Sequence, residues 1–165
     1  MALDRYLSDC AAVAPPFRWT PAQNLHLTIR FLGQVEQAVA EAIADQLDDK
    51  GSPAFDARLG VIGTFKRGRL ARVVWMGVDS GAPEMKALAR VVEEECVAAG
   101  LEAESRAFNA HLTLARARSR EGAVLPELEP PPGLSPWRVD ALILYRSHLG
   151  RAGSVYEPLR TIRLG

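Results

Sequence analysis

Two short segments of this chain contain the same three residues, and they restrict the fold more than any other feature of the sequence. Residues 24–33 read NLHLTIRFLG and residues 109–118 read NAHLTLARAR. Both place His, Leu and Thr in an alternating pattern that is typical of a β-strand. The histidines are 111 − 26 = 85 residues apart in a chain of 165. A repeat of that length is too long for a solenoid. It favours two similar lobes that face each other across a groove, each contributing one strand.

The rest of the chain predicts helices and strands in an order close to one pattern written twice. Apolar residues at helical spacing predict helices, and alternating apolar runs bounded by Gly or Pro predict strands. The predicted helices cover 2–12, 36–49 and 83–99, and the predicted strands cover 25–32, 54–64, 71–79, 109–117, 137–147 and 154–164. Residues 119–136, rich in Glu, Pro and Gly, predict a loop. We therefore expect an α+β fold in a single domain over residues 1–165.

Composition excludes several classes of protein. No apolar run approaches the roughly 20 residues of a membrane span, and the start MALDRYLSD does not resemble a signal peptide. We therefore expect a cytoplasmic monomer without a membrane partner. The formal net charge of zero argues against binding long nucleic acids by charge alone, but allows a nucleotide or one RNA end. Cys10 and Cys96 lack metal-ligand spacing and are interpreted as small buried residues.

Strand parity predicts a chemical role for the two motifs. Side chains alternate between the faces of a strand, so His26 and Thr28 share one face, as do His111 and Thr113. Two imidazoles beside a phosphorus atom suit acid–base hydrolysis of a phosphodiester. An imidazole pKa of about 6.5 allows one ring to accept a proton while the other donates one. The threonine hydroxyls can hydrogen-bond the phosphate oxygens. This chemistry needs no metal and no other cofactor.

One copy of the motif would carry little weight, because Thr is common in strands and a lone His is usually a structural or surface residue. The second copy, with the same parity and the same apolar flanks, favours catalysis. The third histidine, His148, lies in RSHLGRAGS and is interpreted as a turn residue.

LHLTIRFLG and FNAHLTLARAR resemble the paired His-x-Thr-x motifs of the 2H phosphoesterase superfamily. The similar branch is that of the RNA 2′,3′-cyclic phosphodiesterases, also called 2′-5′ RNA ligase-like proteins. RWTPAQNLHLTIRFLG, ARVVWMGV and LILYRSHLGRAGSVYEPL resemble further segments of that branch, so the resemblance covers roughly residues 3–163. It implies a bilobal fold with pseudo-twofold symmetry, duplicated sheet-plus-helix lobes and a central cleft. It also implies metal-independent hydrolysis of RNA 2′,3′-cyclic phosphate ends to 2′-phosphates.

The resemblance also implies roles for single residues. His26 would donate a proton and His111 would accept one, although the sequence alone does not decide which histidine has which role. Thr28 and Thr113 would hold the phosphate.

The fifth residue after each motif histidine is Phe31 or Arg116. The resemblance implies that Arg116 binds the phosphate or ribose and that Phe31 stacks on a base. Simple parity points both away from their histidines, so a bulge or a strand end would have to redirect them. For Phe31, a position in the core is an alternative at least as well supported as base stacking. Arg30 is interpreted as a solvated or salt-bridged residue. Tyr156 and Ser147 match the family's C-terminal pattern, although packing or turn roles explain them equally well.

Two features differ from the family pattern. We expect the family's opening apolar strand to be absent, because Met1 begins almost inside the first predicted helix. We expect either one lobe with an exposed sheet edge or a misplaced start site. Ala110 stands where the family commonly has proline, which affects local rigidity more than the chemistry.

Four hypotheses compete on this evidence, and one of them, a purely structural domain with chance motifs, is disfavoured by the second copy of the motif. The first is metal-independent hydrolysis of the 2′,3′-cyclic phosphate at RNA 3′ ends. The second keeps the cyclic phosphodiesterase and changes its substrate to small cyclic nucleotides or 2′-5′ oligonucleotides, which zero net charge suits. The third is a non-catalytic binder of RNA ends or nucleotides, against which the intact His and Thr of both motifs argue.

Overall fold

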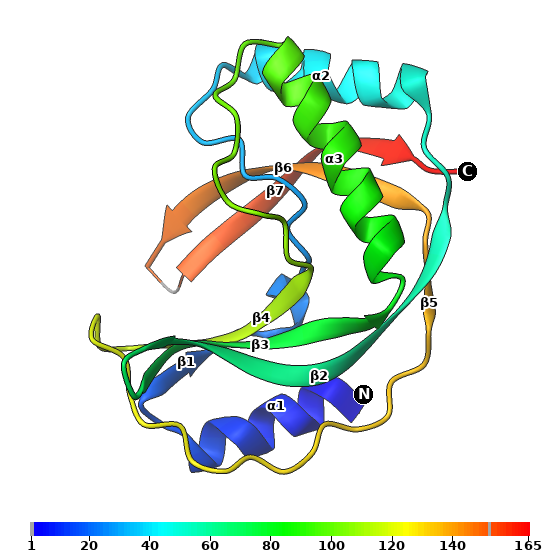
Figure 1. Ribbon diagram of the computed structural model, residues 1–165. Helices are drawn as coiled ribbons and strands as arrows, with labels where there is room; N and C mark the ends of the chain where they lie inside the picture. The colour runs from blue at the N-terminus through cyan, green and yellow to red at the C-terminus, as the bar shows by residue number, and fades with distance from the viewer. Residues whose placement is uncertain (1, 152) are drawn as a thin grey trace. The chain divides into compact units, whose positions relative to one another are not determined.

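The computed structural model describes residues 2–151 and 153–165 of the chain (Figure 1). The contacts divide the chain into two compact units, each assembled from three separate stretches. The first unit comprises Met1–Thr28, Arg58–Ser80 and Ala110–Pro136, and the second comprises Ile29–Ala57, Gly81–Asn109 and Trp137–Gly165. Among the described residues, no helix is both long and apolar enough to cross a membrane.

The first unit contains one α-helix, a short 3₁₀ helix and a curled antiparallel sheet. Its elements are α1 (Ala2–Val13), β1 (Phe17–Trp19), the 3₁₀ helix η1 (Ala22–Asn24), most of β2 (Phe55–Arg67), β3 (Leu70–Ser80) and β4 (His111–Ala117). The strand order is β1-β4-β3-β2, and β5 (Trp137–Val139) pairs with the start of β2. The β2–β3 hairpin closes within the KRGR segment, where Gly68 has φ 61°, a backbone conformation that favours glycine.

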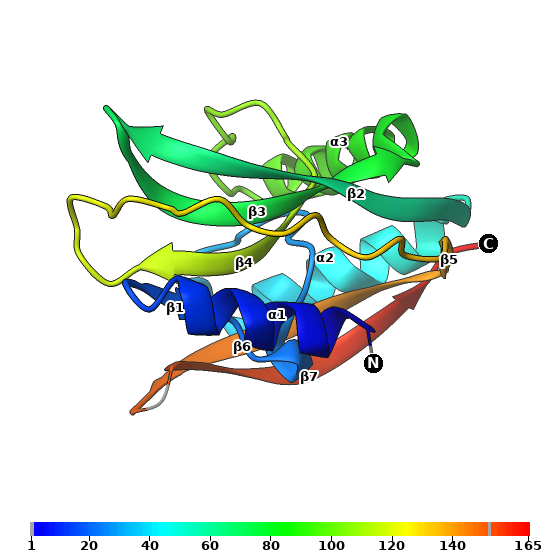
Figure 2. The same cartoon turned by 90° about the horizontal axis from the view of Figure 1, so that it is seen from below.

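One face of this sheet is the core of the first unit. Val74 and Met76 of β3 and Leu114 of β4 are fully buried, and they pack together with Leu7 of α1 and Phe17 of β1. Figures 1 and 2 show α1 running along this side of the sheet. Since strand side chains alternate, the polar residues between these apolar ones lie on the opposite face.

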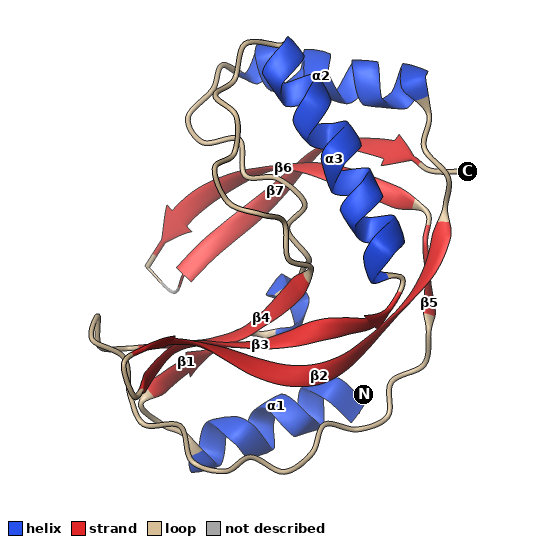
Figure 3. Ribbon diagram, in the orientation of Figure 1, coloured by secondary structure: helices blue, strands red, loops and turns tan. Residues whose placement is uncertain are grey.

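The second unit packs two helices on a strand hairpin (Figure 3). Its main elements are α2 (Gln37–Lys50), α3 (Ala82–Ala98), β6 (Ala141–Gly150) and β7 (Gly153–Arg163). Ile43 and Leu47 of α2, at i, i+4 spacing, meet Val92 and Cys96 of α3 and Ile162 of β7 in one buried cluster. Cys96 has no exposed surface, and burial raises the pKa of its thiol.

Most predicted elements are confirmed, and the exceptions have physical causes. The three helices and the β2–β3 hairpin lie where the sequence predicts them, within a few residues. The prediction of a strand over 25–32 is wrong, since only Leu27 forms a bridge there. Leu27 packs against the first core, whereas Ile29 and Leu32 pack against the second, so the chain leaves the sheet. The predicted strand 137–147 is interrupted at Asp140, between β5 and β6.

Candidate active site

The two His-Leu-Thr motifs lie side by side in the first unit. An antiparallel bridge joins Leu27 to Leu112. Residues on either side of such a pair also face each other, so His26 lies opposite Thr113 and Thr28 lies opposite His111. The expectation of one motif in each lobe is therefore wrong, because both motifs belong to the same unit.

This register also brings the backbones of the two motif histidines close together. His26 and His111 are diagonal neighbours, and the Cα atoms of such residues are separated by about 7–8 Å across an antiparallel pair. Both lie on the face opposite Leu27 and Leu112, which pack in the core.

The local backbone sets the protonation pattern of His26. Its Nδ1 lies 2.8 Å from the carbonyl oxygen of Asn24, the last residue of η1. A carbonyl oxygen only accepts hydrogen bonds, so Nδ1 carries a proton and donates it. Nε2 is therefore the ring nitrogen of His26 that is suited to proton transfer with a substrate.

Two aromatic rings surround His111, and the sequence analysis did not identify either. The ring centroid of Phe65, on β2, is 5.3 Å from that of His111, and the ring of Trp75, on β3, is 6.4 Å away. Both contacts are edge-to-face, an arrangement that favours one orientation of the imidazole. Gly63 makes room for this cluster, since a Cβ there would overlap the indole ring of Trp75.

A bulge in β4 brings Arg116 to the same face as His111 and Thr113. The pairing with β3 steps from Thr113 opposite Trp75 to Ala115 opposite Val74, which leaves Leu114 as an extra residue. Leu114 and Ala115 are consequently both fully buried, and the exposed Arg116 returns to the motif face. Parity without the bulge would have placed Arg116 on the other side.

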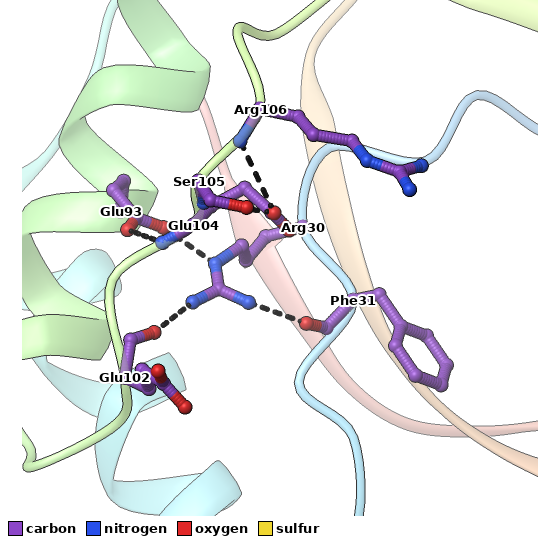
Figure 4. Close-up of polar contacts among 7 residues, drawn as sticks. All are labelled: Arg30, Phe31, Glu93, Glu102, Glu104, Ser105 and Arg106. Carbon is purple, nitrogen blue, oxygen red and sulfur yellow. Dashed lines mark hydrogen bonds and ion pairs between the residues drawn. The ribbon is translucent and has the colours of Figure 1, made fainter.

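Arg30 and Phe31 belong to the second unit, and a polar network holds their backbone there (Figure 4). The guanidinium of Arg30 donates to the carboxylate of Glu93 at 2.5 Å, and to the carbonyl oxygens of Phe31 and Glu102 at 2.6 and 2.7 Å. The predicted salt bridge of Arg30 is confirmed. The Phe31 ring extends away from this network and is 70% exposed, so the alternative of a core position is wrong.

Glu93 receives a further hydrogen bond from the backbone N–H of Glu104 at 2.7 Å. This hydrogen bond and the charge-assisted one from Arg30 both favour the carboxylate, and they lower the pKa of Glu93. The network therefore contributes stability to the second unit while Glu93 is ionised.

The C-terminal residues singled out from the sequence also lie in the second unit. The interpretation of His148 as a turn residue is wrong, because His148 lies within β6. Its Nε2 is 3.1 Å from the carboxylate of Glu157. Ser147 lies opposite Tyr156 in the β6–β7 register. Within residues 2–151 and 153–165, no three His, Cys, Asp or Glu side chains cluster as metal ligands would.

The formal charges of the two units are opposite, although the chain as a whole is neutral. The first unit carries ten Lys or Arg and six Asp or Glu, a formal charge of +4. The second unit carries ten Lys or Arg and fourteen Asp or Glu, a formal charge of −4. The motifs therefore lie in the unit whose charge attracts anions.

Comparisons with known proteins agree on one family. Residues 7–151 match the family model described as the 2′-5′ RNA ligase superfamily. The chain is 31% identical to an RNA 2′,3′-cyclic phosphodiesterase of Aeropyrum pernix, over 98% of this chain and 94% of the relative. It is also 31% identical to the protein of that name from Escherichia coli, over 88% of this chain and 80% of the relative.

A solved structure supports the same fold. The crystal structure of E. coli LigT complexed with 3′-AMP has a TM-score of 0.78 to this chain, covering 98% of this chain and 92% of LigT. The identity over that alignment is 24%, so this likeness concerns the fold alone.

Proposed function

Since the chain belongs to the 2′-5′ RNA ligase superfamily, we propose that it hydrolyses the 2′,3′-cyclic phosphate at RNA 3′ ends to a 2′-phosphate, without a metal ion. The observation that most supports this proposal is the Leu27–Leu112 bridge, which joins the two His-Leu-Thr motifs. The relatives at 31% identity, which are named RNA 2′,3′-cyclic phosphodiesterases, support the choice of substrate.

In the proposed mechanism, His111 accepts a proton from water while the water oxygen attacks phosphorus. The bond from phosphorus to the 3′-oxygen breaks, and His26 donates the proton on Nε2 to that oxygen. A proton donor of this kind needs a proton on its other nitrogen as well, and the Asn24 carbonyl accepts one from Nδ1. After product release, exchange with water restores both rings to their starting protonation states.

We assign contacts with the phosphate groups of the RNA end to three side chains. The hydroxyls of Thr28 and Thr113 donate hydrogen bonds to non-bridging oxygens of the reacting phosphate, whose negative charge grows in the transition state. Arg116 supplies a guanidinium on the same face, where the β4 bulge redirects it. Base stacking by Phe31 stays a prediction, for which its exposed ring is a necessary condition.

The duplicated fold is part of the same proposal. The first unit packs α1 against the β2–β3 hairpin and its neighbours, and the second packs α2 and α3 against the β6–β7 hairpin. This common theme of hairpin and helix supports an internal duplication.

A second candidate keeps the chemistry and changes the substrate to a cyclic mononucleotide. LigT was crystallised with 3′-AMP, a ligand of one nucleotide, and its fold is similar to the fold of this chain. The two candidates differ in whether any group beyond the terminal nucleotide contributes to binding.

The test is to incubate the purified protein with 2′,3′-cyclic AMP in EDTA and to identify the product by phosphorus NMR. We expect 2′-AMP from the wild type and formation of 2′-AMP slower by about 10²–10⁴ in His26→Ala and in His111→Ala. His148→Ala, which removes a histidine of the second unit, is the matched control and should react as the wild type does. A 3′-monophosphate would reverse the leaving group, and loss of activity in EDTA would contradict a metal-independent reaction.

A further inference from the structure

Arg18 is a residue on the motif face that the mechanism above does not use. It lies on β1, directly opposite Arg116 on β4. Its neighbours Phe17 and Trp19 pack against the core, so the side chain of Arg18 emerges on the opposite face of the strand. That is the face which Arg116 shares with His111 and Thr113, and both arginines are exposed.

The pairing of two arginines is unfavourable by itself. Like charges directly opposite each other in an antiparallel pair destabilise a sheet. Among residues 2–151 and 153–165, neither Arg18 nor Arg116 forms an ion pair with a carboxylate, whereas Arg58 and Arg67 of the same unit do. A purely structural arginine pair would be expected to have an acidic partner, so this arrangement indicates an anion from outside the chain.

The register places the arginine pair next to the two motifs. Three contacts follow one another along one edge of β4. Leu112 forms a bridge with Leu27, and the carbonyl oxygen of Leu114 accepts a hydrogen bond from the backbone N–H of Thr20 at 2.8 Å. Arg116 then pairs with Arg18. At about 3.4 Å per strand residue, with one residue taken up by the bulge, the pair lies roughly 7 Å along β4 from Thr113. Consecutive phosphates of an RNA strand are separated by a distance of this order.

We propose that Arg18, together with Arg116, binds the phosphodiester that precedes the terminal nucleotide of the substrate. This inference rests on the proposed function and specifies its substrate as an RNA strand of at least two nucleotides. Two guanidinium groups side by side can donate several charge-assisted hydrogen bonds to one phosphate. The bound phosphate also neutralises the repulsion between them, and the +4 charge of the first unit favours its approach.

The experiment measures binding, so it does not depend on turnover. The dissociation constants of 2′-AMP and of adenylyl-(3′→5′)-adenosine 2′-phosphate are measured for the wild type, Arg18→Gln, Arg18→Lys and Arg5→Gln. The two ligands share the terminal nucleotide, and only the second has the preceding phosphodiester. Arg5→Gln is the matched control, because Arg5 is an exposed residue of α1 on the core side of the sheet.

We expect the wild type to bind the dinucleotide more tightly than 2′-AMP. Arg18→Gln should weaken dinucleotide binding by about tenfold and 2′-AMP binding by much less, because one charged contact to phosphate is lost. Arg18→Lys should retain part of the preference, and Arg5→Gln all of it. Without ligand, Arg18→Gln should melt at the same temperature as the wild type or higher, since a repulsion is removed.

Two results would overturn the inference. One is equal affinity of the wild type for both ligands, and the other is an equal loss for both ligands in Arg18→Gln. Either result with intact turnover of 2′,3′-cyclic AMP would leave the proposed hydrolysis unaffected. Absence of turnover with an intact dinucleotide preference would instead contradict the hydrolysis and keep the phosphodiester site.

Discussion

The two units use their arginines differently. The second unit has a formal charge of −4. Three of its arginines form ion pairs with carboxylates of the same unit, and each pair joins two separate elements or segments. These pairs are Arg30–Glu93, Arg138–Asp56 and Arg160–Asp45. In the first unit, Arg58 and Arg67 also form ion pairs, whereas Arg18 and Arg116 face each other on the surface that also holds both motifs. A net charge of zero therefore describes neither unit, and the sign of each local region is the better guide to what it binds.

This contrast predicts that changes on the motif face of the first unit alter activity, whereas changes in the second unit alter stability.

The largest expected effect concerns the two motif histidines. His26→Ala or His111→Ala should lower kcat/KM for a 2′,3′-cyclic phosphate by about 10²–10⁴, because each removes one partner of acid–base catalysis. Steady-state kinetics with circular dichroism as a folding check would measure this. A fall in kcat/KM of the same size in His148→Ala would contradict the assignment of the chemistry to the first unit.

The core of the second unit should show the opposite behaviour. Leu47→Ala should lower the free energy of unfolding by about 2–5 kcal/mol, since Leu47 is buried between α2, α3 and β7. Urea denaturation would measure the loss, and the matched control is Gln46→Ala on the exposed side of α2, expected to change stability by less than about 0.5 kcal/mol. A large fall in kcat/KM of the folded Leu47→Ala protein would show that this unit takes part in the chemistry.

The threonine hydroxyls allow a finer test within the first unit. Thr113→Val keeps the shape of the side chain and removes one donor to the phosphate, so kcat should fall by about 10². Thr161→Val, at an exposed position of β7, should leave the kinetics unchanged. Equal rates for the wild type and Thr113→Val would remove Thr113 from the proposed phosphate contacts.

The smallest expected effect is a pH dependence of stability in the second unit. The pKa of Glu93 is lowered in the folded protein by the Glu104 N–H and by Arg30. Its contribution to stability is therefore fully present above the ordinary pKa of a glutamate and is lost as the pH falls through the lowered value. Glu93→Gln should lose less stability on acidification than the wild type, as measured by urea midpoints at neutral and acidic pH. Identical losses in both proteins would contradict this role.

The sequence predicts the elements whose signal is local. Helical spacing places α1, α2 and α3 correctly because each has a single apolar face toward one core. The alternation in residues 25–32 is misleading because it is divided between two cores: Leu27 packs in one unit and Ile29 in the other. A one-dimensional pattern does not distinguish a strand with one buried face from a chain that passes between two interiors.

The same distinction applies to the candidate site. His26, Thr28, His111 and Thr113 can be predicted because the repeat marks them directly. Phe65, Trp75 and Arg18 approach the site through the registers of β2, β3 and β1, which sequence spacing does not reveal. The orientation of Arg116 depends on the single extra residue at Leu114, and only the pairing with β3 shows that bulge.

The most direct test of the two-histidine account is the pH dependence of kcat/KM for the wild type and for each histidine variant. The account predicts a bell-shaped profile for the wild type, in which one histidine must be neutral and the other protonated. The residual activity of His111→Ala should no longer fall at low pH, because the general base that becomes protonated there is gone. The residual activity of His26→Ala should no longer fall at high pH, because the general acid is gone. A bell that persists unchanged in both variants would show that other groups carry the proton transfers and would contradict the account.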